Sequence, residues 1–326
     1  MNWKKSIAVA LSAITVMAMV AGCGSNTATN EQKKIGVIQL VEHPSLDAAN
    51  KGFVDGLASK GYKDGQNIKI DQQNAQADQS NLNSIAQRFV SDKKDLVLAI
   101  ATPAAQTMAN ATHDIPIMGT AITDYVTAKL VQSNERPGGN VSGTSDMTPV
   151  EKEVDLIMAL VPNVKRIGAI YTSSEINSQL QVEKMKAYAA SKGITVVEAT
   201  VSNVNDIQQA ATNLVNQDVQ AIYTPTDNVL ASAMANLAQI TDAAKIPVFA
   251  ADEGMTMTGG VATYSVDYYK LGYQTGLMAA KILSGEAKIS DLPIETQKDI
   301  KLTVNEERAK KLGITIPEEL RKDMKQ

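Results

Sequence analysis

The sequence predicts an α/β protein made of two similar lobes, each built around a parallel sheet with helices on both faces. Two observations support this prediction. Short apolar runs alternate with amphipathic segments along the chain, and the same alternation starts again near residue 167. Continuous apolar strands separated by helices are typical of doubly wound parallel sheets.

The alternation is regular enough to assign most elements in turn. In the first half, strands are predicted at residues 35–40, 68–70, 96–100 and 115–119, and helices at 46–59, 80–91 and 104–111. In the second half, strands are predicted at 167–172, 195–201, 221–224 and 246–250, and helices at 151–160, 178–191, 206–216 and 228–244. A later run, VATYSV at 261–266, is also strand-like.

Three short matches between the halves indicate an internal duplication. Residues 35–38 match 167–170, Thr102-Pro103 matches Thr224-Pro225, and residues 114–117 match 245–248, all in the same order. Ligands of open α/β sheets bind beyond the carboxyl ends of the strands. Two such lobes facing each other would therefore enclose a cleft that could close around a ligand by a hinge motion.

The N-terminus has the layout of a bacterial lipoprotein signal. Lys4 and Lys5 precede an apolar run at 7–20, which leads to Ala21-Gly22 and then to Cys23, the only cysteine. We expect residues 1–22 to be removed and Cys23 to carry fatty acyl chains such as palmitate, more than one for stable tethering. A transmembrane helix, which needs ~20 apolar residues, and an ordinary secretory signal are the alternatives.

This interpretation locates the protein on the outer face of the cell membrane. The polar residues 23–32 would be a flexible tether between the membrane and the folded part of the chain. Because Trp3 is the only tryptophan, the processed protein would contain none.

Composition excludes several function classes. The net charge is −4 and no basic cluster follows the signal, which argues against nucleic-acid binding. His43 and His113 are the only histidines and have no metal-site spacing, so no metal or other cofactor is predicted. No thiol nucleophile remains and no Gly-x-Ser-x-Gly motif is present, so we do not expect an enzyme.

The candidate ligand-binding residues are those of the loops that follow the predicted strands. They are Gln39, His43, Thr102, Pro103, Ala104, Thr123 and Asp124 in the first half, and Ser173, Glu175, Asn177, Ser178, Thr226, Asp227, Asp252 and Asp267 in the second. Hydroxyl, amide and carboxylate groups are frequent there, and arginine is absent. A ligand with one ammonium and one carboxylate suits this set better than a polyanion, which arginine would bind.

Each candidate also has a simpler interpretation. Serine, threonine and aspartate before a helix are commonly N-caps. Asp227 and Asp252 are the favoured ammonium ligands because each follows directly on an apolar strand. Tyr268, like Tyr125 and Tyr269, could stack on an aromatic ligand or pack in the core. His43 is interpreted as a loop hydrogen-bonding residue rather than as a base.

Several phrases resemble a known family. DYVTAKLV at 124–131, PGGNVSGTSD at 137–146, YTSSEINS at 171–178, and TVN with AKKLGITIP near the end, at 303–317, are similar to ABC-transporter substrate-binding lipoproteins of the tryptophan/tyrosine type. The resemblance covers essentially the whole processed chain. It implies the type I periplasmic-binding-protein fold, with two lobes, three hinge crossings and the ligand in the cleft.

The resemblance also implies partners and boundaries. The ligand would be tryptophan, tyrosine or phenylalanine, and the partners would be the permease and ATPase of an importer for amino-acid transport. Lobe 1 would comprise residues 33–145 and 254–285, and lobe 2 residues 146–253 and 286–326. A membrane-tethered ligand sensor with the same fold is the alternative function.

Overall fold

The computed structural model describes residues 32–324, of which residues 33 onward belong to one compact unit. The predicted signal, Cys23 and nearly all of the predicted tether lie outside the described residues. Within the described range, no helix combines the length and the apolar character needed to cross a membrane.

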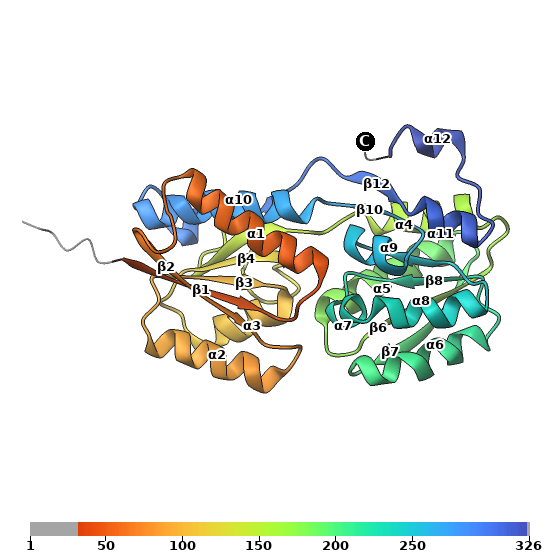
Figure 1. Cartoon of the computed structure of the whole chain (residues 1–326), viewed down its shortest axis with the longest axis horizontal. Helices are drawn as coiled ribbons and strands as arrows, with labels where there is room; N and C mark the ends of the chain where they lie inside the picture. The colour runs from red at the N-terminus through yellow and green to blue at the C-terminus, as the bar shows by residue number, and fades with distance from the viewer. Residues whose placement is uncertain (1–31, 325–326) are drawn as a thin grey trace, which may run out of the picture. The chain divides into compact units, whose positions relative to one another are not determined.

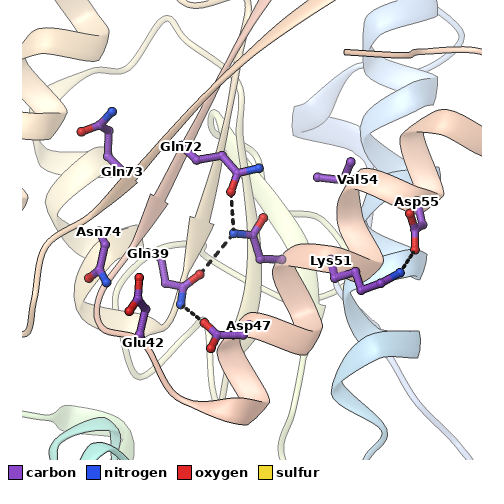
Figure 2. Close-up of a pocket in the computed structure, with 10 residues that line it drawn as sticks. Gln39, Glu42, Asp47, Lys51, Val54, Asp55, Gln72, Gln73 and Asn74 are labelled. Atoms are coloured by element: carbon purple, nitrogen blue, oxygen red, sulfur yellow. Dashed lines mark hydrogen bonds and ion pairs between the residues drawn. The ribbon is translucent and has the colours of Figure 1, made fainter.

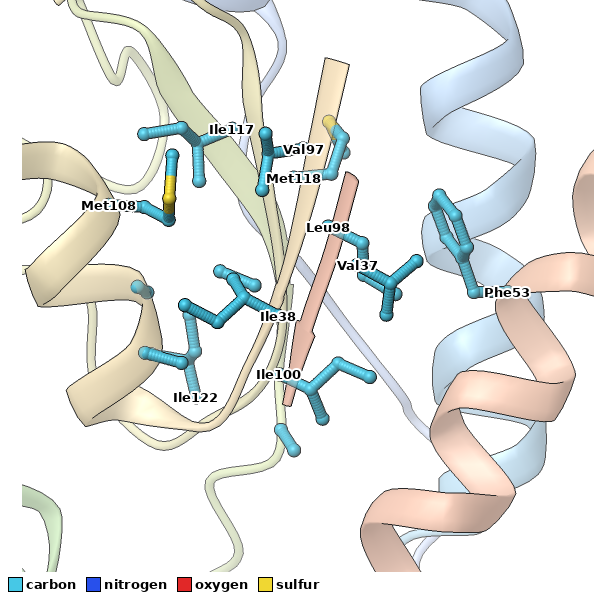
Figure 3. Packing of buried hydrophobic residues seen from close by; sticks show 14 of the residues in the cluster. Val37, Ile38, Phe53, Val97, Leu98, Ile100, Met108, Ile117, Met118 and Ile122 are labelled. Atoms are coloured by element: carbon cyan, nitrogen blue, oxygen red, sulfur yellow. The ribbon is translucent and has the colours of Figure 1, made fainter. Parts of the chain in front are cut away.

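Lobe 1 is a six-stranded sheet covered by helices on both faces (Figure 1). The strand order is β11 (Glu295–Thr296), β5 (Val141–Ser145), β4 (Ile117–Ile122), β3 (Leu96–Ile100), β1 (Lys33–Gln39) and β2 (Ile68–Asn74), and all pairs are parallel. One face is covered by α1 (Pro44–Ser59) and α10 (Tyr268–Ser284), and the other by α2 (Gln79–Ser91) and α3 (Thr102–Ala111). Figure 3 shows this sandwich, with Phe53 and Met108 on opposite sides of the strands.

Lobe 2 repeats the plan with four parallel strands. The order is β7 (Thr195–Val201), β6 (Arg166–Thr172), β8 (Ala221–Thr224) and β9 (Val248–Ala250). The pair α4 (Val150–Leu160) and α5 (Ile176–Ser191) packs together, as does the pair α6 (Ile207–Val215) and α8 (Met234–Ala243). Two separate apolar clusters form the core of this lobe.

The remaining elements of lobe 2 are short. An antiparallel pair, β10 (Ala262–Ser265) and β12 (Lys301–Val304), contacts α4 and α9 (Glu253–Gly259). The others are α7 (Asn228–Ser232), α11 (Glu306–Lys311), α12 (Glu318–Arg321) and the 3-10 turn η1 (Val204–Asp206); a second turn, η2 (Ile289–Asp291), contacts β5 of lobe 1.

The two sheets confirm the predicted duplication. The order β2-β1-β3-β4 in lobe 1 corresponds to β7-β6-β8-β9 in lobe 2. The matching Ile-Pro pairs hold the same position, since Val97 N donates to Pro116 O and Ile222 N to Pro247 O, both at 2.9 Å. The expected architecture of two doubly wound lobes is therefore correct.

Three segments cross between the lobes. Residues 146–149 connect β5 to α4, residues 266–267 connect β10 to α10, and residues 297–300 connect β11 to β12. The second and third crossings are tied together, because Asp267 N donates to Gln297 Oε1 at 3.1 Å and Gln297 Nε2 donates to Asp267 O at 2.7 Å. The three-crossing hinge expected from the resemblance is present.

The lobe boundaries differ from the predicted ranges. Residues 254–265 belong to lobe 2, because β10 pairs with β12 and α9 packs on β9. Residues 286–296 belong to lobe 1, because β11 pairs with β5. The predicted helix at 228–244 is also two helices, α7 and α8, separated at Ala233, whose backbone is not helical (φ −129°).

Helices α1 and α10 pack at unusually close range. A Cβ added at Gly272 would lie 1.9 Å from Ala49 O, and one at Gly52 would lie 2.1 Å from Tyr269 O. Only glycine allows the two backbones to approach this closely. The contact fixes the start of α1, and with it His43 and Leu46, relative to the start of α10 at Tyr268.

Candidate functional site

The loops at the carboxyl ends of the strands meet in a small polar cavity between the two lobes. It is lined from lobe 1 by the start of α1, the loop after β4 and the start of α10, from the hinge by the first crossing, and from lobe 2 by the loops after β6, β8 and β9. The lining residues are His43, Leu46, Ala121, Thr123, Asp146, Asn177, Thr226, Asp227, Asn228, Asp252 and Tyr268. The cavity measures about 10 Å³, which is room for one water at most.

Direct hydrogen bonds join the lobes around this cavity. Ser45 Oγ donates to Asp252 Oδ1 at 2.9 Å, and the hydroxyls of Thr123 and Thr226 lie 3.1 Å apart. The Thr226 hydroxyl also accepts from Gln181 Nε2 at 2.5 Å. Ser45 lies in the first turn of α1, Gln181 lies in α5, and the other side chains lie in loops after strands, so the lobes meet through loops and helices.

Asp227 is held entirely by its own lobe. Its Oδ2 accepts from Thr172 N at 2.6 Å and from Ser178 Oγ at 2.8 Å, while its Oδ1 accepts from Thr172 Oγ1 at 2.7 Å and from Leu230 N at 2.9 Å. Burial still raises the pKa of this carboxyl above its usual range. Four donors fill the usual hydrogen-bonding capacity of a carboxylate, so Asp227 has none left for a ligand.

Glu175 is a second buried acid with local partners. Its Oε2 accepts from Asn228 Nδ2 at 2.6 Å and from Asn177 Nδ2 at 3.0 Å, and its Oε1 accepts from Asn228 N at 3.2 Å. Burial, and then the nearby charge of Asp227, raise the pKa of Glu175 to about 8. Glu175 therefore holds two asparagines at the cavity and does not line it itself.

Asp146, on the first hinge crossing, is the acid with unused capacity. Its Oδ2 accepts from Tyr268 Oη at 2.9 Å, and its buried Oδ1 has no partner among the described residues. Burial raises the pKa of Asp146 to about 6. The hydroxyls of Tyr268 and Thr123 oppose this rise, and the nearby charge of Asp252 adds to it. Asn177 Oδ1 is likewise buried without a partner in the described chain. Two residues of the cavity thus carry acceptor atoms that lack a donor.

His43 bridges the lobes weakly. Its Nε2 lies 3.4 Å from Asn228 Oδ1, and burial lowers its pKa although Asp252 and Asn228 partly oppose this. Burial therefore favours the neutral imidazole, which fits the prediction of a hydrogen-bonding residue rather than a base.

The predicted site residues divide into four groups by position. His43, Thr123, Asn177, Thr226, Asp227 and Asp252 line the cavity. Glu175 and Ser178 are buried behind it and bond to lining residues. Thr102, Pro103 and Ala104 form the first turn of α3, and the other four, Gln39, Asp124, Ser173 and Asp267, lie elsewhere.

These four have local roles in the structure. Asp124 accepts from Thr127 N at 2.6 Å, and Asp267 caps α10 by accepting from Lys270 N at 3.1 Å. Ser173 is exposed. Gln39 lines a wider hollow of about 540 Å³ that belongs to lobe 1 alone, between α1 and β2, where it donates to Asp47 at 2.6 Å (Figure 2).

Comparisons with known proteins identify the family of this chain. Residues 34–326 match the family model of the ABC transporter substrate binding proteins. The chain belongs to this family. It is 44% identical to a tyrosine-binding protein of Clostridioides difficile (strain R20291) over 322 residues, which is 95% of this chain and 93% of the relative.

Two solved structures of similar sequence bear on the cavity of this substrate-binding protein. A Streptococcus pneumoniae domain in complex with L-Trp is 44% identical, covers 90% of this chain and 98% of its own, and superposes with a TM-score of 0.86. The other is the ligand-free, open structure of a Clostridium difficile substrate-binding protein with adhesive properties. It is 47% identical and covers 90% of this chain and 98% of its own, yet it superposes with a TM-score of only 0.68. The conformation described here is therefore closer to that of the L-Trp complex.

Sequence reasoning missed several residues of the cavity of this family member. Leu46, Ala121 and Asn228 adjoin predicted residues in the same loops, so neighbourhood in sequence could have indicated them. Asp146 was missed because the strand before it, VSGTS, is polar and has no apolar signature. Tyr268 was considered for stacking, and it both lines the cavity and bonds to Asp146.

Proposed function

We propose that this protein captures an aromatic amino acid, tyrosine or tryptophan, in the interlobe cavity and delivers it to an ABC importer. The observation that carries the proposal is the acceptor-rich cavity, where Asp146 and Asn177 have buried oxygens without donors. A zwitterion brings the missing N–H donors. The aromatic character of the ligand is inferred from two relatives, one a tyrosine-binding protein and the other solved in complex with L-Trp.

The rest of the cavity suits the other parts of such a ligand. The hydroxyls of Thr123 and Thr226 are possible donors for a carboxylate. Leu46, Ala121 and the ring of Tyr268 add apolar surface to the lining, against which an aromatic side chain can pack.

Binding in this place requires the lobes to separate first. A cavity of about 10 Å³ is far below the ~300 Å³ or more of typical small-molecule pockets. The interlobe hydrogen bonds would break on opening and give way to ligand contacts on closing. The lower TM-score against the open relative supports such a hinge motion in this family.

Fluorescence titration with L-Trp tests the proposal. The processed chain, residues 23–326 with Cys23→Ser, contains no tryptophan, so the indole signal comes from the ligand alone. We expect a saturable spectral change that tyrosine reverses by competition. If neither amino acid binds, by fluorescence or by calorimetry, the proposed ligand class is wrong.

We further propose that the protein is exported and held on the outer face of the membrane by lipid on Cys23, where it meets the permease and ATPase. The support is the sequence of the first 23 residues. Cys23→Ser should release the protein from the membrane fraction into the medium or periplasm. Unchanged membrane association of this variant would show that another feature anchors the protein.

A further inference from the structure

The acids around the cavity are not equivalent, and the difference lies in their hydrogen bonds. Six buried side-chain oxygen or nitrogen atoms among the described residues have no partner, and two of them, Asp146 Oδ1 and Asn177 Oδ1, belong to residues that line this cavity. Both atoms are acceptors. Asp146 is 3% exposed and Asn177 is 4% exposed, so both side chains are largely shielded from bulk water.

The other acids have donors of their own. Asp227 accepts four hydrogen bonds within lobe 2, and Glu175 accepts from Asn177 and from the side chain and backbone of Asn228. Asp252 is intermediate: its Oδ1 accepts from Ser45 Oγ at 2.9 Å and from Met255 N at 2.7 Å. Unused acceptor capacity is therefore divided between Asp146 of the hinge and Asn177 of lobe 2.

We infer that the ammonium group of the ligand is held by Asp146 of the hinge and Asn177 of lobe 2, with Asp252 supplying additional negative charge, and not by Asp227 or Glu175. This inference rests on the proposed function, because it assigns one end of the proposed ligand. A primary ammonium has three N–H donors, which can satisfy both orphan oxygens at once.

Charge favours a cation over a neutral donor at this point. Asp146 and Asp252 are both at least 97% buried and close enough for the charge of Asp252 to raise the pKa of Asp146. Two like charges enclosed together oppose closure of the lobes. An ammonium between them removes this repulsion, whereas a neutral amide or hydroxyl would not.

The position of Asp146 also links the ammonium to the hinge. Asp146 N donates to Ile122 O at 3.1 Å at the end of β4, and its Oδ2 is bonded to Tyr268, the first residue of α10 after the second crossing. Asn177 is the second residue of α5 of lobe 2, and its Nδ2 donates to Thr226 O at 2.8 Å. An ammonium bound to both residues would join the two crossings to lobe 2.

The test compares two ligands that differ in the ammonium group. L-Trp carries it, and indole-3-propionate, which has the same ring and carboxylate, does not. Asp146→Asn keeps an oxygen for the Tyr268 hydroxyl and removes the charge. We expect this variant to bind L-Trp about 10- to 100-fold more weakly than wild type, while its affinity for indole-3-propionate stays equal or rises.

Two further variants separate a specific role from a general one. Asp227→Asn should disturb lobe 2 and weaken both ligands by a similar factor. Asp114→Asn, the same change at an exposed position before β4, should leave both affinities within about twofold of wild type. Thermal unfolding of each variant shows whether it is folded under the titration conditions.

The outcomes are distinct. A selective loss of L-Trp affinity in Asp146→Asn supports the assignment. An unchanged ratio of the two affinities in that variant overturns it, and a selective loss in Asp227→Asn instead would place the ammonium at Asp227. Failure of wild type to bind any aromatic amino acid overturns the proposed function and this assignment together.

Discussion

Replacing Asp227 by alanine removes the acceptor of four hydrogen bonds inside lobe 2. The donors are Thr172 N, Thr172 Oγ1, Ser178 Oγ and Leu230 N, at 2.6–2.9 Å. At about 1 kcal/mol net for each bond, their loss costs about 4 kcal/mol. The buried carboxylate carries a desolvation cost of its own, seen in its raised pKa, so the expected loss of unfolding free energy is about 2–4 kcal/mol.

Urea unfolding of the ligand-free protein, followed by far-UV circular dichroism, measures this loss. Asp114→Ala is the matched control, because Asp114 is exposed, and its unfolding free energy should stay within about 0.5 kcal/mol of wild type. Asp227→Ala with a loss below about 1 kcal/mol but a large loss of ligand affinity would refute the reasoning. The carboxylate would then serve the ligand and not lobe 2.

Two other predictions concern stability away from the cavity. Burial raises the pKa of Glu153 to about 8, so between pH 5 and 8 the folded state holds a proton that the unfolded state has lost. Over that range, the unfolding free energy of wild type should fall relative to that of Glu153→Gln by about 1.4 kcal/mol per pH unit. Parallel pH profiles of the two proteins would contradict this. Gly272→Ala should lower the unfolding free energy by about 1–3 kcal/mol or more, because its Cβ would lie 1.9 Å from Ala49 O. Gly139→Ala, with open space around the added Cβ, is the control. Equal midpoints of urea unfolding for the two variants would show that α1 and α10 can separate without cost.

Much of the fold could be predicted because its signals are local. The buried strands of both lobes are short apolar runs, and the Ile-Pro pairs before β4 and β9 occupy the same hydrogen-bonded position in each sheet. The segments that were not predicted as strands, β5, β11 and β12, are short or polar. The hydroxyls of β5 are satisfied by distant partners, as where Ser142 donates to Leu292 O at 2.7 Å. Such pairings leave no local pattern.

The lobe boundaries depend on the same kind of long-range pairing. Residues 262–265 join lobe 2 largely through β12, which lies about forty residues later and pairs with them antiparallel. Residues 295–296 join lobe 1 through β5 and through the contact of Glu295 with Gln274 of α10. Neither partnership can be deduced from the segments themselves.

The site shows where sequence reasoning reaches its limit. Strand ends identify which loops meet, and six of the predicted residues line the cavity. Sequence does not say whether an acid at a strand end has free oxygens. The oxygens of Asp227 are occupied by Thr172 and Ser178, which lie about fifty residues earlier in the chain, whereas Asp146 follows a polar strand and keeps one oxygen without a donor.

The central claim, that the ligand enters between the lobes after they separate, can be tested most directly by locking them together. The Thr123 and Thr226 hydroxyls are 3.1 Å apart across the cavity, so cysteines at both positions are placed to form a disulfide in the chain that lacks Cys23. The reduced double variant lacks the two hydroxyls proposed to bind the carboxylate, so it should bind L-Trp more weakly than wild type. Oxidation should abolish the remaining binding until a reductant is added. Equal affinity in the oxidised and reduced forms would contradict the claim and place the ligand outside this cavity.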